Sequence, residues 1–380
     1  MTEKLYYIDA YTEKFTARVL SVEFREPYYV TVLDRTAFFP EEGGQSADTG
    51  TLGTASVLDV KERGGVIYHY LDGELQIGSE VVGIIDFAPR YDKMKQHTAE
   101  HILSGFFYSV FGLSNVGFHL GASEVTLDID GVLSREELIR IEALANGAVR
   151  ACIPVKQYFP SPKELEEMSY RSKLDLKEGV RIVEIEGVDT CACCAPHVKN
   201  TGEIGIIKLV SSEMWRGGMR LVMHAGERAL SDYERKLSSV AVISKELSAP
   251  RDEIVSAVLK LKEDFDALKG KCAEKDRRIA ELLADAALPT EGNAVVYLRD
   301  MTSDGLIAFS NLALAKIGGI LVAVTGEEGS YKYVISSSSV DLRARAKEIN
   351  AALSGRGGGR PEMIQGSFFS KLSDIREYFK

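Results

Sequence analysis

The sequence has 380 residues, of which 45% are hydrophobic and 27% are charged, and its formal net charge at pH 7 is -10. This length exceeds the size at which one hydrophobic core stops growing, so two or three domains are expected. No segment approaches the roughly 20 apolar residues of a membrane span, and the acidic balance argues against a protein that binds nucleic acid over its whole surface.

Residues 1–88 are expected to form a small β-barrel domain. Apolar and polar residues alternate in the segments 17–24, 28–34 and 65–71, which Gly-Gly pairs and Asp-Gly turns separate. This alternation is typical of strands joined by tight turns. The first residues lack the basic and apolar regions of a signal peptide, so a cytoplasmic location is expected.

The tripeptide Gly43-Gly44-Gln45 lies inside this domain. Release factors use the same tripeptide to position water against an ester on transfer RNA, but three residues predict no more than a glycine turn between strands. Thr36 and Gln45 nevertheless offer a hydroxyl and an amide that can orient a small polar substrate.

A second, mixed α+β domain is expected over residues 89–226. At position 88 the alternation gives way to helical spacing, which continues through residues 92–112 and ends at Gly112. Strands are predicted within 117–130 and between 180 and 225. Between them, residues 134–152 are predicted to form a helix that begins with a capping box of Ser134 and Glu137.

Two pairs of residues in this domain have the spacing of metal ligands. His97 and His101 are four residues apart on the predicted helix, so both imidazoles project from one face. Cys193 precedes His197 by four residues in a loop, and tetrahedral zinc sites use such pairs. One zinc ion per chain is therefore predicted. Glu100 lies off the face that carries the histidines. In zinc proteases the glutamate comes directly after the first histidine, and here it does not, so the pattern is not that of a zinc protease.

The cysteines support a metal or reactive site over a disulfide framework, because they are odd in number and three occupy four positions. They are Cys152, Cys191, Cys193, Cys194 and Cys272. Cys191 and Cys194 compete with Cys193 as the ligand. Four protein ligands leave no position for water, so a structural zinc is the alternative to a catalytic one.

Residues 227–287 are expected to form a helical linker, which Pro250 interrupts. In its second half, apolar residues follow a heptad spacing. They are Ile254, Val258, Leu261, Phe265, Leu268 and Cys272, with Ile279 and Leu282 in the same phase. The spacing predicts either a helical hairpin packed on itself or a coiled coil between two chains. The second interpretation implies a homodimer, for which the C-terminal domain is the alternative interface.

Residues 288–380 alternate strand and helix patterns, which predicts a C-terminal α/β domain. A glycine-rich segment, 354–367, precedes the last predicted helix. From Leu342 to Lys380 there are eight lysines and arginines against four acidic residues, so this part has a local charge of +4.

Four motifs in this order resemble the AlaX family, freestanding relatives of the editing domain of alanyl-tRNA synthetase. The motifs are residues 33–50 (LDRTAFFPEEGGQSADTG), 96–104 (QHTAEHILS), 193–205 (CCAPHVKNTGEIG) and the segment 354–367, which is similar to the glycine-rich motif of the DHH-associated domain in the long form of AlaX. The resemblance implies hydrolysis of the ester of mischarged tRNA(Ala), chiefly seryl-tRNA(Ala), with glycyl-tRNA(Ala) as a second substrate to test.

The resemblance also implies site residues. The zinc ligands of the family fall on His97, His101, Cys193 and His197, which selects Cys193 among the thiols, and its polar pocket residues fall on Thr36 and Gln45. In the family, two glycines and a threonine usually separate the cysteine from the histidine. Here Cys194, Ala195 and Pro196 stand between them, so the role of that threonine is vacant.

A transfer RNA substrate requires cationic contacts to phosphate. Arg356 and Arg360 flank three glycines whose backbone amides can approach phosphates, and Arg171 and Lys173 lie near the zinc loop. A non-catalytic RNA-binding protein with a structural zinc is the alternative. A synthetase fragment is rejected because the predicted barrel begins within the first few residues.

Overall fold

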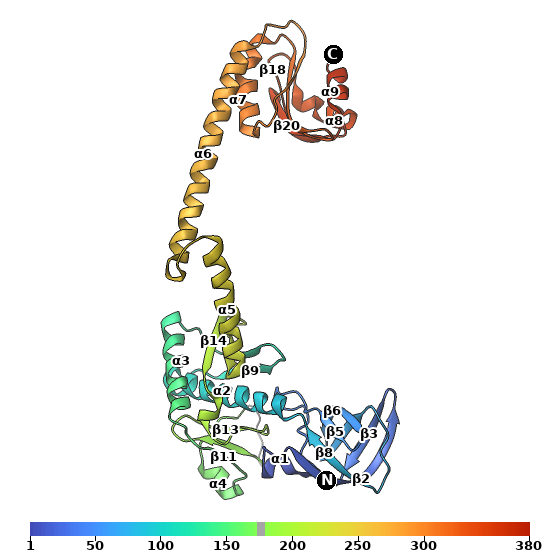
Figure 1. The fold of residues 1–380 in the computed structure, drawn as a ribbon, viewed down its shortest axis with the longest axis vertical. Coiled ribbons are helices and arrows are strands. Elements are labelled where there is room, and N and C mark those ends of the chain that lie inside the picture. Colours follow the sequence, from blue (N-terminus) through green and yellow to red (C-terminus); the bar gives the residue numbers. More distant parts are fainter. Residues whose placement is uncertain (173–178) are drawn as a thin grey trace. The chain divides into compact units, whose positions relative to one another are not determined.

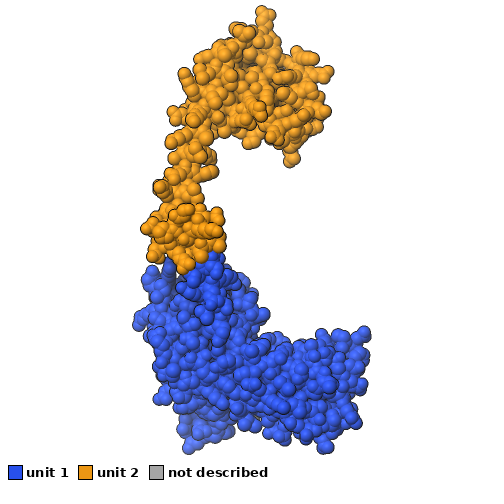
Figure 2. All heavy atoms as spheres, in the orientation of Figure 1, with its two compact units in different colours: residues 1–239 blue, residues 240–380 orange. Residues whose placement is uncertain are grey.

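The computed structural model describes residues 1–172 and 179–380 as a mixed α+β protein with several sheets. The chain divides into two compact units, residues 1–239 and 240–380 (Figure 2). Within the described ranges no helix has both the length and the apolar character needed to cross a bilayer.

The first unit begins with a closed barrel in which the strand order is β2-β3-β7-β6-β5-β8. Alternation along the strands directs one set of side chains inward: Phe15, Ala17 and Val19 of β2 are buried, and the residues between them are exposed. A short helix, α1 (Leu5–Ile8), and two short strands, β1 (Glu3–Lys4) and β4 (Arg35–Thr36), precede or interrupt the barrel. The barrel strands are β2 (Lys14–Arg25), β3 (Tyr28–Leu33), β5 (Gly50–Leu52), β6 (Ala55–Arg63), β7 (Val66–Leu71) and β8 (Glu80–Ile85).

The rest of the first unit is built around α2 (Phe87–Phe111), which extends from the barrel into the mixed α+β part (Figure 1). Its apolar residues share a core with α3 (Arg135–Arg150) and with the sheet β14-β15-β10-β9. A second sheet, β11-β12-β13, contacts α2 through β13. The remaining elements are β9 (Asn115–Leu120), β10 (Val125–Ile129), β11 (Val155–Tyr158), α4 (Pro162–Glu167), β12 (Ile182–Ile185), β13 (Asp189–Ala192), the 3-10 turn Thr201–Ile204, β14 (Ile207–Trp215) and β15 (Gly218–Ala225).

Local signals in the sequence fix the ends of two helices as predicted. The capping box of Ser134 and Glu137 is present at the start of α3, with both reciprocal hydrogen bonds formed. Gly112 ends α2 in the left-handed conformation (φ 68°), which glycine adopts without steric cost.

A buried ion pair, which the sequence analysis did not single out, joins α2 to the barrel. The Arg90 guanidinium is fully buried and donates to the Asp48 carboxylate at 2.9 Å. It also donates to the backbone carbonyls of Ala10 and Ala37, at 3.0 and 2.7 Å. Asp48 accepts a further bond from the Phe39 amide at 2.6 Å. All these partners precede α2 in the chain, so one side chain holds the start of the helix against the barrel.

Two helices, α5 (Glu227–Glu246) and α6 (Ile254–Ala286), occupy the predicted linker, and the chain breaks between them at Pro250 as predicted. Much of the heptad seam of α6 is exposed: Phe265 is 65% exposed and Leu268 59%. Toward its end α6 packs on α7, where Ala280 and Ala284 join a buried cluster.

The second unit contains a five-stranded sheet, β16-β17-β18-β20-β19, with buried clusters on both faces. The glycine-rich segment contributes the edge strand β19 and most of its neighbour β20. Position 357 of β19 requires glycine, because a Cβ there would lie 2.3 Å from both the Tyr333 hydroxyl and a carbonyl of β20. The elements are β16 (Ala294–Tyr297), α7 (Ser303–Ala313), the 3-10 turn Leu314–Lys316, β17 (Ile320–Glu327), β18 (Ser330–Ser337), α8 (Leu342–Ala352), β19 (Arg356–Arg360), β20 (Met363–Phe368) and α9 (Leu372–Tyr378).

Candidate metal centre

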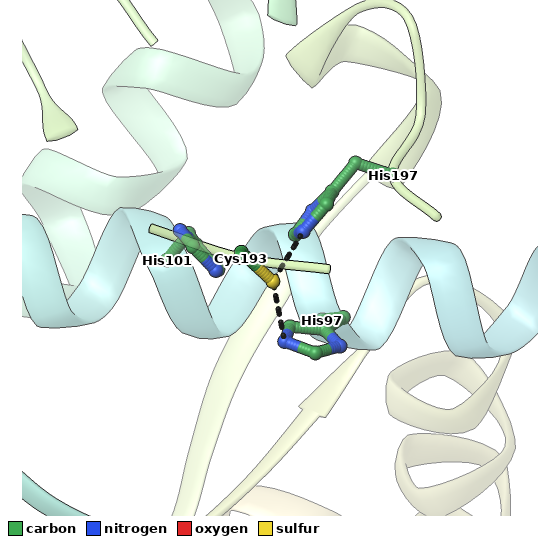
Figure 3. Close-up of side chains that lie close together, drawn as sticks. All are labelled: His97, His101, Cys193 and His197. Carbon is green, nitrogen blue, oxygen red and sulfur yellow. Dashed lines mark hydrogen bonds between the residues drawn. The ribbon is translucent and has the colours of Figure 1, made fainter. Parts of the chain in front are cut away.

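The structure brings His97, His101, Cys193 and His197 together (Figure 3). The histidines of α2 meet the loop that follows β13, and the four ligand atoms lie within 4.8 Å of one another. The Cys193 Sγ is 3.6 Å from the His97 Nε2 and 3.3 Å from the His197 Nε2. Zinc bonds of about 2.0 Å to nitrogen and about 2.3 Å to sulfur place such atoms about 3.5 Å apart in a tetrahedron. The spacing and the donor atoms therefore suit zinc.

Each imidazole is oriented by a second residue on its Nδ1 atom. The partners are Gln45 Oε1 for His97 (3.1 Å), Asp189 Oδ2 for His101 (3.0 Å) and Thr98 Oγ1 for His197 (3.0 Å). The Thr98 hydroxyl donates its own proton to the Met94 carbonyl, so it accepts from His197. All three partners thus favour the tautomer that carries the proton on Nδ1. That tautomer leaves a lone pair on each Nε2, as a metal ligand requires.

Among the three neighbouring thiols, the surroundings favour Cys193 as the ligand. Burial opposes its ionisation, but the neighbouring imidazoles and their hydrogen bonds outweigh burial and hold the pKa of Cys193 well below its ordinary value. By contrast, burial raises the pKa of Cys191 to about 11 and also raises the pKa of Cys194. The thiolate is the form that binds metal.

The loop carrying Cys193 is fixed by hydrogen bonds and by packing. Arg181 donates to the carbonyls of Cys193 and Ala195, at 3.0 and 2.8 Å, and its own carbonyl accepts from the Cys193 amide at 3.0 Å. Ala195, within the segment that departs from the usual family loop, is fully buried in the barrel core. This segment therefore anchors the ligand loop to the barrel.

Of the two predicted polar pocket residues, the structure places Gln45 against the metal centre and Thr36 inside the barrel. Gln45 is fully buried and contacts His97, as described above. Thr36 is also fully buried, and its hydroxyl bonds the His69 Nε2 at 2.9 Å and the Phe38 amide at 3.1 Å. Burial lowers the pKa of His69 to about 4, so its imidazole is neutral. No pattern in the sequence indicated a role for His69.

A cavity of about 1280 Å³ adjoins three of the four ligand residues and is lined by residues of α2, the glycine turn and the β13 loop. Its walls include His97, His101 and Cys193, together with Glu100, which is 4% exposed. Helical spacing alone placed Glu100 off the histidine face, yet its Oε2 lies 3.9 Å from the His101 Nε2.

The predicted RNA contacts fall in different places. Arg171 lines the cavity, where it donates to both oxygens of Asp189, at 2.7 and 2.8 Å. It thereby supports the carboxylate that orients His101. Lys173 lies outside the described residues. Arg356 and Arg360 are exposed at the two ends of β19, in the second unit.

Replacing Gln45 by methionine tests its role in orienting His97. The variant keeps the shape of the side chain but loses the acceptor for the His97 Nδ1 proton. We expect zinc affinity, measured by competition with a chelator, to fall about 10- to 100-fold. Glu41→Gln, an exposed change in the same loop, is the matched control and should leave the affinity unchanged. Equal affinities for Gln45→Met and wild type would contradict the role.

Two family models match parts of the first unit. A model described as class II (A) tRNA synthetases matches residues 8–88, and one described as the threonyl and alanyl tRNA synthetase second additional domain matches residues 180–222. The second range contains both Cys193 and His197.

Curated relatives match nearly all of the chain. An alanine–tRNA ligase of Natronomonas pharaonis is 34% identical over 96% of this chain, which spans only 42% of that ligase. The alanyl-tRNA editing protein AlaX-L of Pyrococcus horikoshii is 28% identical over 99% of this chain and 96% of its own length. The alanyl-tRNA editing protein Aarsd1 of Mus musculus is 28% identical over 94% of this chain and 92% of its own length.

Proposed function

Since the chain belongs to the AlaX family in its long form, we propose that it hydrolyses the ester of mischarged tRNA(Ala), chiefly seryl-tRNA(Ala), with glycyl-tRNA(Ala) as a second substrate. The observation that supports this most is a centre of three oriented imidazoles and a thiolate that opens on a cavity of about 1280 Å³. Pockets for small molecules measure about 300–1,000 Å³, so this cavity has room for an aminoacyl ester on a terminal nucleotide.

Each residue of the candidate metal centre has a proposed role, either as a zinc ligand or as a group that orients a ligand. His97, His101, Cys193 and His197 would hold one zinc ion, which when bound supplies positive charge beside the ester. Gln45 and Asp189 fix two of the imidazoles, and Arg171 fixes Asp189. Because four protein ligands complete a tetrahedron, a positioning role for the metal fits the geometry at least as well as activation of water.

Editing of serine has a clear physical basis. A pocket that accepts alanine rejects serine only modestly, because serine adds one hydroxyl, so a second hydrolytic site is needed. A site that hydrogen-bonds the serine hydroxyl leaves a polar group unpaired when alanine enters, and this spares alanyl-tRNA(Ala). Thr36 and Gln45 are the proposed polar residues of that site.

A deacylation assay tests the proposed function. Purified protein is incubated with seryl-tRNA(Ala), glycyl-tRNA(Ala) and alanyl-tRNA(Ala), before and after removal of metal by a chelator. We expect faster hydrolysis of the seryl ester than of the alanyl ester, and loss of that activity with the metal. If transfer RNA binds but no ester is hydrolysed faster than in buffer, the protein is instead an RNA-binding protein with a structural zinc, which the full ligand set also fits.

Thr36→Val tests the proposed contact with the serine hydroxyl. Under this proposal the ratio of seryl to alanyl hydrolysis falls about 10-fold or more. The loss of the partner of His69 should also lower the free energy of unfolding by about 1–3 kcal/mol. Thr31→Val is the matched control, because Thr31 is a buried barrel residue whose hydroxyl has no hydrogen bond within the described chain. An unchanged ratio for Thr36→Val would remove Thr36 from the pocket.

We further propose that β19 contacts the transfer RNA backbone through Arg356 and Arg360. Replacing both by alanine should weaken binding of tRNA(Ala) and lower the magnitude of the slope of log affinity against log salt by about 1.4–1.8, since each lost phosphate contact contributes about 0.7–0.9. Arg299→Ala removes an exposed arginine elsewhere in the second unit and serves as the control. A slope that stays unchanged would place the RNA surface elsewhere.

The exposed heptad seam of α6 supports the proposal that two chains associate through a coiled coil. Light scattering on the full chain measures this association directly.

A cytoplasmic location is also proposed, because the five cysteines are unpaired in the structure and reducing compartments favour free thiols.

A further inference from the structure

Glu100 places a buried carboxylate in the wall of the cavity, between the two histidines of α2. It is 4% exposed. Its Oε1 accepts a hydrogen bond from the Ser104 hydroxyl at 2.5 Å and another from the Asn115 amide. These bonds fix the orientation of the carboxylate. Its Oε2 lies 3.9 Å from the His101 Nε2, on the side of the metal centre.

The other carboxylates of the cavity wall differ from Glu100. Asp189 is committed to His101 and Arg171, through both of its oxygens. Glu42 is exposed on the glycine turn. Within the described residues, Glu100 is thus the buried carboxylate of this wall that has an oxygen without a hydrogen bond.

The cationic side chains in the described wall of the cavity are committed to other partners. Lys4 bonds Glu62 at 2.7 Å, and Arg171 forms its two bonds to Asp189. Arg181 is held by the backbone carbonyls of Cys193 and Ala195. A buried carboxylate is costly unless a cation or hydrogen-bond donors compensate its charge. Apart from the zinc ion that the four ligands would hold beside it, the second oxygen of Glu100 has no lysine or arginine partner in the described wall, so its charge is available to a cation that enters the cavity.

We propose that Glu100 binds the α-ammonium group of the aminoacyl ester. This inference rests on the proposed function and specifies its substrate class: esters whose amino acid carries a free α-amino group. An ester whose α-amino group is acylated, as in peptidyl-tRNA, carries no charge at that nitrogen and would leave Glu100 without this cation. The α-ammonium group is common to serine, glycine and alanine, so Glu100 excludes N-blocked esters and does not discriminate among these amino acids.

The experiment compares seryl-tRNA(Ala) with N-acetylseryl-tRNA(Ala) for the wild type and for Glu100→Gln. Glutamine keeps an acceptor for Ser104 and Asn115 but removes the charge. We expect kcat/KM of the wild type to be higher for the free amine. The substitution should lower kcat/KM for the seryl ester about 10- to 100-fold, as the loss of a charged hydrogen bond implies, and leave the N-acetylated ester unaffected. Bound zinc should remain at the wild-type level.

Glu42→Gln removes the exposed carboxylate of the same wall and should leave the ratio between the two esters unchanged. A Glu100→Gln variant that loses activity on both esters equally, or that loses zinc, overturns the inference and assigns Glu100 to support of the metal centre. An unchanged ratio also overturns it, while the proposed function stands. Wild-type protein that hydrolyses neither ester overturns both.

Discussion

Replacing Cys193 by alanine is expected to lower bound zinc from about one ion per chain to near zero. The variant removes the only sulfur among the four grouped ligand atoms, and it removes the one whose thiolate form the surroundings stabilise. Structural zinc sites bind with about 10–16 kcal/mol, and a site reduced to three imidazoles would lose much of this. Elemental analysis of the purified protein, after dialysis against a weak chelator, measures the change. Hydrolysis of seryl-tRNA(Ala) should fall with the metal.

Cys191→Ala and Cys194→Ala are the matched controls, since each removes a neighbouring thiol from the same cavity wall. Both variants should keep about one ion per chain. Full zinc content in Cys193→Ala, together with its loss in Cys191→Ala, would transfer the ligand role to Cys191. That outcome has a structural counterpart, because His101, Asp189 and Cys191 form a second group of potential ligand atoms.

Replacing Arg90 by alanine is expected to lower the free energy of unfolding of the first unit by about 3–5 kcal/mol. The change leaves Asp48, which is 2% exposed, without its cation and deprives the carbonyls of Ala10 and Ala37 of their donor. The sole tryptophan, Trp215, lies in β14 of the first unit, so its fluorescence during denaturation reports on this unit of the full chain.

Two further variants make the result for Arg90 specific. Arg25→Ala breaks the exposed pair with Glu23 and should leave the unfolding midpoint unchanged. Arg90→Met combined with Asp48→Asn removes both charges and should recover part of the loss, because no uncompensated charge remains buried. A single variant Arg90→Ala as stable as the wild type would show that packing, rather than this ion pair, holds α2 to the barrel.

Features encoded by nearby residues could be predicted from the sequence. The period of α2 placed His97 and His101 on one face, and the structure has them 5.5 Å apart between ring centroids. The capping box was also predictable, because Ser134 and Glu137 are close together in the sequence. Strand alternation located the segments of the barrel and of the C-terminal sheet.

Features that depend on contacts between distant segments could not be predicted. The bond between Thr36 and His69 joins residues 33 positions apart, so no local pattern indicated it, and the substrate contact of Thr36 stays a prediction. Glu100 was set aside because helical spacing placed it off the histidine face and the zinc-protease pattern was absent, and neither observation shows which residues pack against that side of the helix. Nothing near Arg90 in the sequence indicated that its guanidinium is buried, because its partners Asp48 and Ala37 lie in a distant segment. In each case the missing information was which surfaces pack together.

The three groups that orient the histidines come from the barrel, from α2 itself and from β13, at sequence separations of 52, 99 and 88 residues from their partners. Contacts of such separation form late, because loop-closure entropy delays them. The barrel must therefore fold and dock, and the segment with β13 must reach α2, before all three lone pairs face one point. During refolding, tight zinc binding should therefore coincide with the last folding step of the first unit rather than with its nucleation. A zinc-sensitive dye can measure when that step occurs.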